Sequence, residues 1–319
     1  MSFLSKTLGK ISAKYRTLSD WAVIYRQIVT SKPITKKTVL NRDYHHKRIL
    51  AHLGDREIGL IRPHDIAGLI SRVYETHPHT AKRMLIEARD MFQEAVDYGW
   101  IDRNPAASLK QVKVKVARLR LTLNEWVAIR TYAEKNSPPW VSRMLVLALV
   151  TGQRRGDLMK MKFSDVWSDD GVECLHIIQE KSGSRISIPL DLRIDAIGVS
   201  VRDAIESCRG YAKLIDGDNT CLVRKTTGKP LAGASMSWRF EQAREGALGL
   251  HKGDGAPPSL HECRSLSERI YREQGINTMT LLGHASQGMT DLYNDDRGLS
   301  AKEGRWKVVS LSPAKSASA

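Results

Sequence analysis

Apolar side chains recur every three or four residues through most of the first hundred positions, a period that fits helices and not strands. The first of these stripes consists of Trp21, Ile24, Tyr25 and Ile28. A second helix is predicted at about 35–53 with Gly54 after its end, and a later one ends at Gly99, where a helix-terminating glycine belongs. We therefore predict a compact, all-helical domain over residues 18–112.

Basic segments flank this predicted domain. Residues 1–17 contain four basic side chains and no acidic one, which fits either a short amphipathic helix that docks on a partner or a frayed basic tail. Between 113 and 121, valines alternate with lysines, which predicts an extended linker with one basic face. Such a face suits a DNA phosphate backbone, and a solvated surface strand is the alternative. The basic residues of this linker are Lys113, Lys115, Arg118 and Arg120.

The balance of charge points to a polyanionic partner. The chain has 50 lysines and arginines against 35 aspartates and glutamates, a formal net charge of +15. Nucleic acid is the commonest partner of so basic a protein, although an anionic lipid surface or simple solubility would also account for the charge. The longest apolar run, 144–150, is far short of the roughly 20 residues that span a bilayer. With no secretory signal either, we expect a cytoplasmic protein with reduced cysteines.

A second domain is predicted over residues 122–298. Thr122 and Glu125 form a capping box ahead of a new apolar stripe, so a helix begins here. Further on, the buried run 144–150 leads into Thr-Gly-Gln and Arg154. An arginine at the end of such a run can be held at the edge of the core and directed into a cleft.

Two strands are predicted inside this second domain, at 172–180 and 185–190, with Lys181 at the start of the turn between them. A short apolar helix ends at a glycine farther along the chain and leaves His284 just beyond it. The fold class that follows is mainly α with a small antiparallel β-sheet.

A second capping box is predicted from Ser259 and Glu262, which would open a helix after two prolines. His261 and Arg264 are three residues apart and so share one face of that helix. Tyr293 follows later in a polar stretch. Taken singly, a tyrosine or a histidine–arginine pair of this kind is usually a packing residue or a salt-bridged helix face.

The order of these motifs is more specific than any one of them. They are T-G-Q-R at 151–154, Q-E-K-S-G at 179–183, H-E-C-R-S-L-S at 261–267, L-L-G-H at 281–284 and Y-N-D-D-R-G at 293–298. In this order the sequence resembles the tyrosine recombinases, and among them the phage integrases of the lambda type. The resemblance covers roughly residues 17–309.

The resemblance implies a helical, SAM-like core-binding domain followed by a tyrosine-recombinase catalytic domain, with a strand and tail at 299–319 that pack on their own or a neighbouring subunit. It implies site-specific integration and excision of a phage or prophage genome by a homotetramer on double-stranded DNA attachment sites. No metal or ATP is implied. Integrases of the lambda type carry an additional amino-terminal domain that binds arm sites, and the 17 or so residues ahead of the helical domain are too few to form one. Whether that domain is truncated here, absent, or replaced by the basic segment stays open, and so do a host DNA-bending factor and an excisionase.

The resemblance also assigns six catalytic side chains. Tyr293 would attack the phosphodiester, Arg154 and Arg264 would clamp the phosphate, and His261, His284 and Lys181 would donate hydrogen bonds or move protons. Asp157 stands where glutamate is usual, and a carboxylate there suits a salt bridge that orients Arg154. No carboxylate triad for a metal is evident in the sequence.

Two other classes of function stay open. A type IB topoisomerase or a telomere resolvase would use the same pocket on a single duplex. A non-catalytic DNA-binding relative is the other alternative, and the complete set of six side chains argues against it.

Overall fold

The computed structural model describes residues 16–114, 118–215, 220–253 and 255–294. The chain divides into two compact units, one ending at Val116 and one beginning at Ala117. Three predictions fall outside the described residues: the basic segment ahead of Arg16, Lys115 of the linker, and the C-terminal strand and tail.

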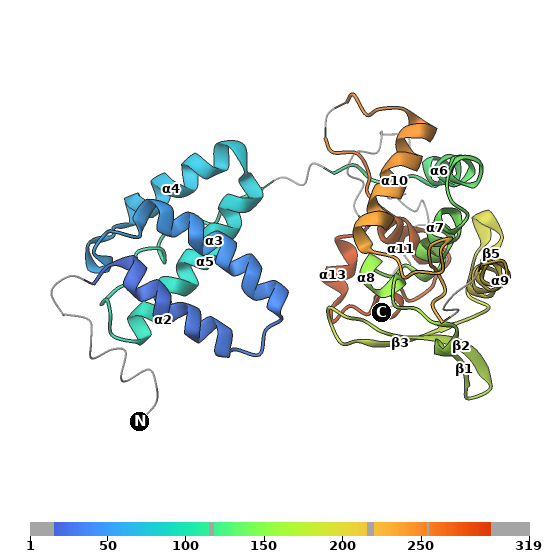
Figure 1. Ribbon diagram of the computed structural model, residues 1–319, viewed down its shortest axis with the longest axis horizontal. Coiled ribbons are helices and arrows are strands. Elements are labelled where there is room, and N and C mark those ends of the chain that lie inside the picture. The colour runs from blue at the N-terminus through green and yellow to red at the C-terminus, as the bar shows by residue number, and fades with distance from the viewer. Residues whose placement is uncertain (1–15, 115–117, 216–219, 254, 295–319) are drawn as a thin grey trace, which may run out of the picture. The chain divides into compact units, whose positions relative to one another are not determined.

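The first unit is a bundle of helices, as the apolar period predicts (Figure 1). Its elements are α2 (Leu18–Ser31), α3 (Lys36–Leu53), the 3-10 turn Ile58–Leu60, α4 (Pro63–Thr76) and α5 (Pro78–Asp97). Thr17 begins the bundle with a capping box to Asp20. Gly99 has a φ of +67°, which ends the last helix as predicted. Trp21 and Phe92 are fully buried at the centre of the bundle.

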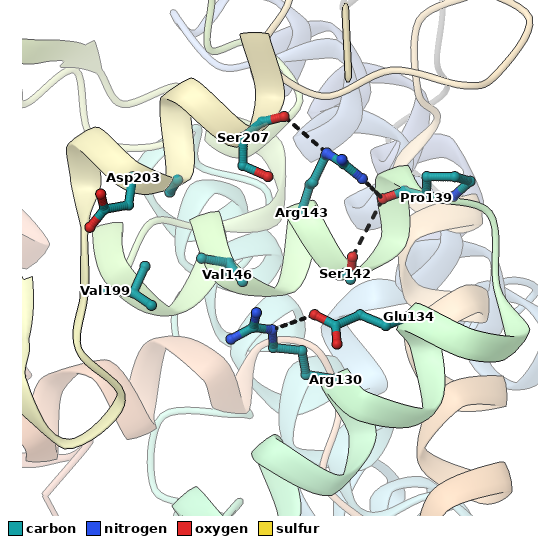
Figure 2. A pocket seen from close by; sticks show the side chains of 10 residues that line it. Arg130, Glu134, Pro139, Ser142, Arg143, Val146, Val199, Asp203 and Ser207 are labelled. Carbon is teal, nitrogen blue, oxygen red and sulfur yellow. Dashed lines mark hydrogen bonds and ion pairs between the residues drawn. The ribbon is translucent and has the colours of Figure 1, made fainter. Parts of the chain in front are cut away.

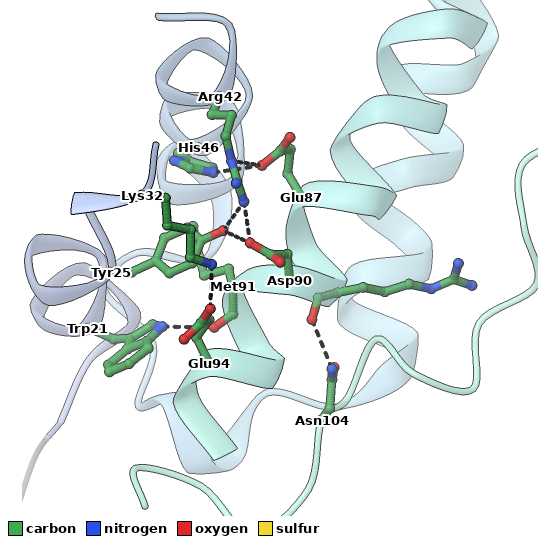
Figure 3. Close-up of polar contacts among 11 residues, drawn as sticks. Trp21, Tyr25, Lys32, Arg42, His46, Glu87, Asp90, Met91, Glu94 and Asn104 are labelled. Atoms are coloured by element: carbon green, nitrogen blue, oxygen red, sulfur yellow. Dashed lines mark hydrogen bonds and ion pairs between the residues drawn. The ribbon is translucent and has the colours of Figure 1, made fainter. Parts of the chain in front are cut away.

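A polar network ties three of these helices together (Figure 3). Arg42 of α3 forms ion pairs with Glu87 and Asp90 of α5. The hydroxyl of Tyr25 on α2 donates to Asp90 at 2.5 Å, and His46 lies 3.1 Å from Glu87. Burial raises the pKa of Tyr25 above its usual range. Because the polar groups of this network are hydrogen-bond partners of one another, its role is to hold the helices together.

The second unit combines helices with a small antiparallel sheet, which confirms the predicted fold class. Its helices are α6 (Leu123–Asn136), α7 (Trp140–Thr151), α8 (Arg155–Leu158), α9 (Val201–Ala212), α10 (Gly233–Leu248), α11 (Glu262–Glu273), α12 (Thr278–Leu282) and α13 (Gln287–Asp291). Its sheet has the order β1 (Val166–Asp169), β2 (Val172–Ile178) and β3 (Arg185–Pro189), and β4 (Arg193–Ile194) pairs with β5 (Val199–Ser200). The β2–β3 hairpin matches the predicted one; β1, β4 and β5 were not predicted.

Helix α7 is buried along most of its length and carries the core of this unit. α11 packs against it, and the Tyr271 hydroxyl of α11 donates to the Val150 carbonyl at 2.8 Å. Gly152 ends α7 with a φ of +62°, and a Cβ atom built there would lie 2.8 Å from the Ser267 hydroxyl. Glycine is therefore required both for the turn and for the close approach of α11.

The two predicted capping boxes have different outcomes. The box of Thr122 and Glu125 is confirmed at the start of α6. The box of Ser259 and Glu262 is wrong: α11 begins at Glu262, after His261, with no side-chain cap. The Glu262 carboxylate instead pairs with a buried arginine at 3.0 Å. Within the described ranges, no helix has the length and apolar character needed to cross a bilayer.

Candidate active site

Tyr293 lies among three of the residues that the sequence singles out. Its hydroxyl is 3.3 Å from Nε2 of His261. Its ring packs on that of His284, with centroids 5.3 Å apart and planes inclined by 28°. The guanidinium carbon of Arg264 is 5.6 Å from the centre of the same ring. Four residues from three separate motifs therefore meet at one place.

The guanidinium group of Arg264 is held by hydrogen bonds to two backbone carbonyls and a histidine. Nη1 donates to the Gly152 carbonyl at 2.8 Å, and Nη2 donates to the Leu282 carbonyl at 2.6 Å. Nη2 also lies 2.9 Å from Nε2 of His284. The buried Nε–H has no hydrogen-bond partner among the described residues. Desolvation, and next the charge of Arg154, lower the pKa of this guanidinium to about 10, which leaves it cationic at neutral pH.

Arg154 follows the turn at Gly152 and is oriented by a glutamine. Its Nη1 donates to Oε1 of Gln179 at 2.7 Å. Gln179 is itself 1% exposed, and its Nε2 donates to Oε1 of Gln153 at 2.7 Å and to the Leu282 carbonyl at 3.0 Å. This chain of amides connects the end of α7, the β2–β3 hairpin and α12.

Sequence reasoning gave no role to these two glutamines. Gln153 is 2% exposed, and its Nε2 donates to the Leu281 carbonyl at 2.8 Å. A signal was present, because Gln153 follows the buried apolar run 144–150 and Gln179 lies at the end of the strand predicted at 172–180. A polar side chain there must find buried partners.

Asp157 does not have the predicted role. No ion pair joins it to Arg154 among the described residues. Its Oδ1 accepts the backbone N–H of Glu180 at 2.9 Å, so this carboxylate fastens the base of the hairpin turn. The predicted salt bridge to Arg154 is therefore not formed in the part of the chain that the structure describes, and Gln179 accepts from Arg154 instead.

Lys181 lies in the β2–β3 turn and is exposed. The turn is fixed at its base, where the Ser182 hydroxyl donates to Oε1 of Gln179 at 2.8 Å and Gly183 adopts a φ of +69°. The ammonium group of Lys181 is one of the charges that lower the pKa of His261. The predicted hairpin lysine therefore lies within electrostatic range of the tyrosine's partner.

Both histidines are neutral at pH 7. Desolvation, followed by the charges of Arg264 and Arg154, lowers the pKa of His261 and of His284 to about 4. An arginine can only donate, so Nε2 of His284 accepts from Arg264 and its Nδ1–H points to the Thr290 hydroxyl, 2.9 Å away. A neutral His261 can accept a proton from a group 3.3 Å away.

These lowered values predict a dependence of stability on pH. A histidine of pKa about 4 when folded and about 6.5 when unfolded takes up protons only in the unfolded chain between those pH values. Its stabilising contribution is complete above pH 6.5 and falls as the pH decreases toward 4. When the pH is lowered from 7.5 to 5, we expect the unfolding free energy of the His284→Gln variant to decrease less than that of the native chain. The difference should be on the order of 1 kcal/mol. Urea unfolding at both pH values measures this, and equal losses would contradict it.

Open space adjoins this cluster. A cavity of about 320 Å³ is lined by Arg154, Arg155, Gly156, Ser237, Ser259, Leu260 and His261. Arg155 donates to the Ser237 hydroxyl at 2.6 Å. Another hollow, between α6, α7 and α9, is lined by Arg130, Glu134 and Arg143 among others and contains none of the predicted site residues (Figure 2).

The predicted linker residues differ in exposure. Lys113 and Arg118 are exposed. Arg120 is not: its side chain is 2% exposed and pairs with Glu262. The predicted phosphate contact of Arg120 is therefore wrong, because its guanidinium is enclosed by protein groups.

Comparison with known proteins agrees with this geometry. The family model "Phage integrase family" matches residues 119–298, and "Phage integrase central domain" matches residues 23–112. Prophage integrase IntE of Escherichia coli (strain K12) is 37% identical over 319 residues, covering 97% of this chain and 82% of the relative. The integrase of Escherichia phage lambda is 37% identical over 285 residues, covering 88% of this chain and 77% of the relative.

Solved structures of lambda integrase match as well. A fragment crystallised as a dimer bound to a COC′ core site has a TM-score of 0.82 at 35% identity, covering 93% of this chain and 100% of that one. A tetramer bound to a Holliday junction has a TM-score of 0.83 at 33% identity, covering 98% and 84%. From the family models and from these relatives, which match along nearly its whole length, it follows that the chain belongs to the phage integrase family of tyrosine recombinases.

Proposed function

We propose that this chain cuts and rejoins duplex DNA at specific sites with Tyr293 as its nucleophile, and so integrates and excises a phage or prophage genome. One observation carries the proposal: the Tyr293 hydroxyl lies 3.3 Å from a neutral imidazole, beside a guanidinium. A tyrosine packed only for stability would not need a base at its hydroxyl and a cation beside its ring.

The proposed reaction exchanges one phosphate ester for another. The Tyr293 oxygen attacks phosphorus, His261 accepts the phenolic proton, and the bond to the 5′-oxygen breaks. A 3′-phosphotyrosine bond replaces it, and attack by another 5′-hydroxyl restores the DNA backbone. Because the ester bond is conserved, the step needs no ATP.

Negative charge on the phosphoryl oxygens is the main electrostatic problem of this reaction. Arg154 presents a planar guanidinium group that can donate to two oxygens at once, and Arg264 brings a second fixed positive charge to the same site. Both are held by hydrogen bonds before any DNA arrives, so little reorganisation is needed in the transition state. Lys181, exposed on its turn, would give a proton to the leaving 5′-oxygen.

The proposed partner is double-stranded DNA in the bacterial cytoplasm. The net charge of +15 supports binding to a polyanion. Recombination of two duplexes requires four cuts, so we propose a homotetramer on DNA, as in the lambda integrase structure on a Holliday junction. A host DNA-bending factor and an excisionase are further proposed partners.

Trapping on nicked DNA tests this function. The substrate is a duplex carrying the junction sequence of the mobile element that encodes this chain, nicked near the cleavage position so that the short cleaved strand diffuses away. We expect a covalent adduct whose attached peptide contains Tyr293. An adduct on another residue would overturn the assignment. Relaxation of supercoils without exchange between two sites would favour a topoisomerase.

The buried amide chain gives a prediction of its own. Gln179→Met keeps a similar volume and removes the acceptor that orients Arg154. We expect adduct formation at saturating DNA to slow by about 10- to 100-fold, because small misplacements of catalytic groups are costly. Single-turnover kinetics measure the effect. Gln274→Met is the matched control, since Gln274 donates to the Arg193 carbonyl and to Asp195 instead, and a comparable loss there would contradict the argument.

A further inference from the structure

Arg120 makes a set of contacts that the proposed chemistry does not use. Nη1 donates to Oε2 of Glu262 at 3.0 Å and to the Ser265 hydroxyl at 2.6 Å. Nη2 donates to the carbonyl of Leu292 at 2.7 Å. The Ser265 hydroxyl in turn donates to the carbonyl of Tyr293 at 3.0 Å. One buried arginine thus connects the first turn of α11 to the backbone at the nucleophile.

The segment that carries Tyr293 is short and lies partly at the surface. α13 is only five residues long, and Leu292 beside the tyrosine is 68% exposed. Thr290 is buried, and Arg272 forms an ion pair with Asp291 at 2.9 Å. Arg120 and Ser265 bind the backbone carbonyls of Leu292 and Tyr293, directly after this helix. A helix this short is not stable by itself, so such contacts decide where the tyrosine lies.

Glu262 makes the arrangement specific for a cation. Its side chain is 7% exposed and that of Arg120 is 2% exposed. A buried charge without its partner is costly, which keeps the guanidinium at this position and directed toward the carbonyls. Exposed linker residues such as Arg118 lack this enclosure.

We propose that Arg120 is a positioning residue, which holds the Tyr293 segment against α11 so that the hydroxyl faces His261. The inference rests on the proposed function, because it concerns the nucleophile of that reaction. Arg120 would then affect the rate of DNA cleavage and not the affinity for the phosphate backbone.

Two variants test the proposal. Arg120→Met combined with Glu262→Gln removes both buried charges together and keeps their volumes, so no unpaired charge is left. Ser265→Ala removes only the hydroxyl that reaches the Tyr293 carbonyl. The matched control is Arg143→Met, because Arg143 also donates to two backbone carbonyls, those of Pro139 and Ser207, but on the α7–α9 side of the unit (Figure 2).

Three measurements are made on the full chain: adduct formation at saturating DNA, DNA affinity as a function of salt, and hydrogen exchange of residues 287–294 without DNA. For the double variant we expect adduct formation about 10- to 100-fold slower, unchanged affinity and salt dependence, and faster exchange in that segment alone. Ser265→Ala should show the same pattern, with adduct formation slowed by about 3- to 10-fold. The control should match the native chain.

The outcomes separate the alternatives. Native rates in both variants would overturn the positioning role. A lower affinity with a shallower salt dependence, at an unchanged saturated rate, would restore the phosphate contact. If the double variant does not fold, Ser265→Ala decides. If the native chain forms no adduct, the proposed function fails, and hydrogen exchange alone still shows whether these contacts hold the segment.

Discussion

Tyr293→Phe is expected to bind the same DNA as tightly as the native chain and to form no covalent adduct with it. The substitution removes one oxygen and keeps the ring, so the packing against His284 and Arg264 is retained. Without the phenolic oxygen no protein atom in the cluster can replace the bond to the leaving 5′-oxygen. We expect a loss of at least ~10⁴-fold in cleavage, because removal of a catalytic nucleophile costs far more than removal of a stabilising donor.

Denaturing gels of the nicked-DNA reaction measure this loss, and a filter-binding titration measures affinity. Tyr98→Phe is the matched control: Tyr98 is 41% exposed in the first unit, and its ring contact with Trp21 survives the change. Adduct formation by Tyr293→Phe at even a tenth of the native rate would show that another residue attacks the phosphorus. The proposed division of roles among the two arginines and two histidines would then have to be rebuilt around that residue.

The parts of the site that were predictable are those fixed by local chain geometry. Gly152 and Gly283 follow buried runs and adopt φ values of +62° and +60°, so Arg154 and His284, which come after them, are placed at defined points beside the core. The hairpin was predictable because strands of alternating character flank a turn with glycine, and its tip carries Lys181. In each case the neighbouring sequence determines where the side chain goes.

The predictions that were wrong concern side chains whose partners are distant in sequence. Alternation along the linker predicted that Arg120 shares an exposed basic face with Lys113. Leu119 and Leu121 also flank it, and the side chain turns inward because Glu262, 142 residues later, is buried at the same place. The resemblance to the recombinases paired Asp157 with Arg154, whereas Asp157 accepts the backbone N–H of Glu180 in the hairpin. Which of several chemically equivalent contacts forms is decided by tertiary packing.

The clamp provides the second large effect. Arg154→Met is expected to reduce adduct formation at saturating DNA by about 100- to 1000-fold, since one fixed donor to the transition-state charge is lost. The fold should tolerate the change, because Oε1 of Gln179 keeps its hydrogen bond from Ser182 at 2.8 Å. Arg154→Lys should recover only a small part of the rate: an ammonium group keeps the charge but not the planar pair of donors.

Arg155 makes this prediction sharper, because it is adjacent in sequence and borders the same cavity. Its guanidinium donates to Ser237, and no hydrogen bond joins it to Gln179 in the described part of the chain. We expect Arg155→Met to slow adduct formation by less than about 10-fold, with any effect mainly on DNA affinity. Single-turnover rates and urea midpoints of both variants decide between them. If the larger loss of rate belonged to Arg155, the guanidinium oriented by Gln179 would not be the one that meets the phosphate, and the buried amide chain would serve the fold alone.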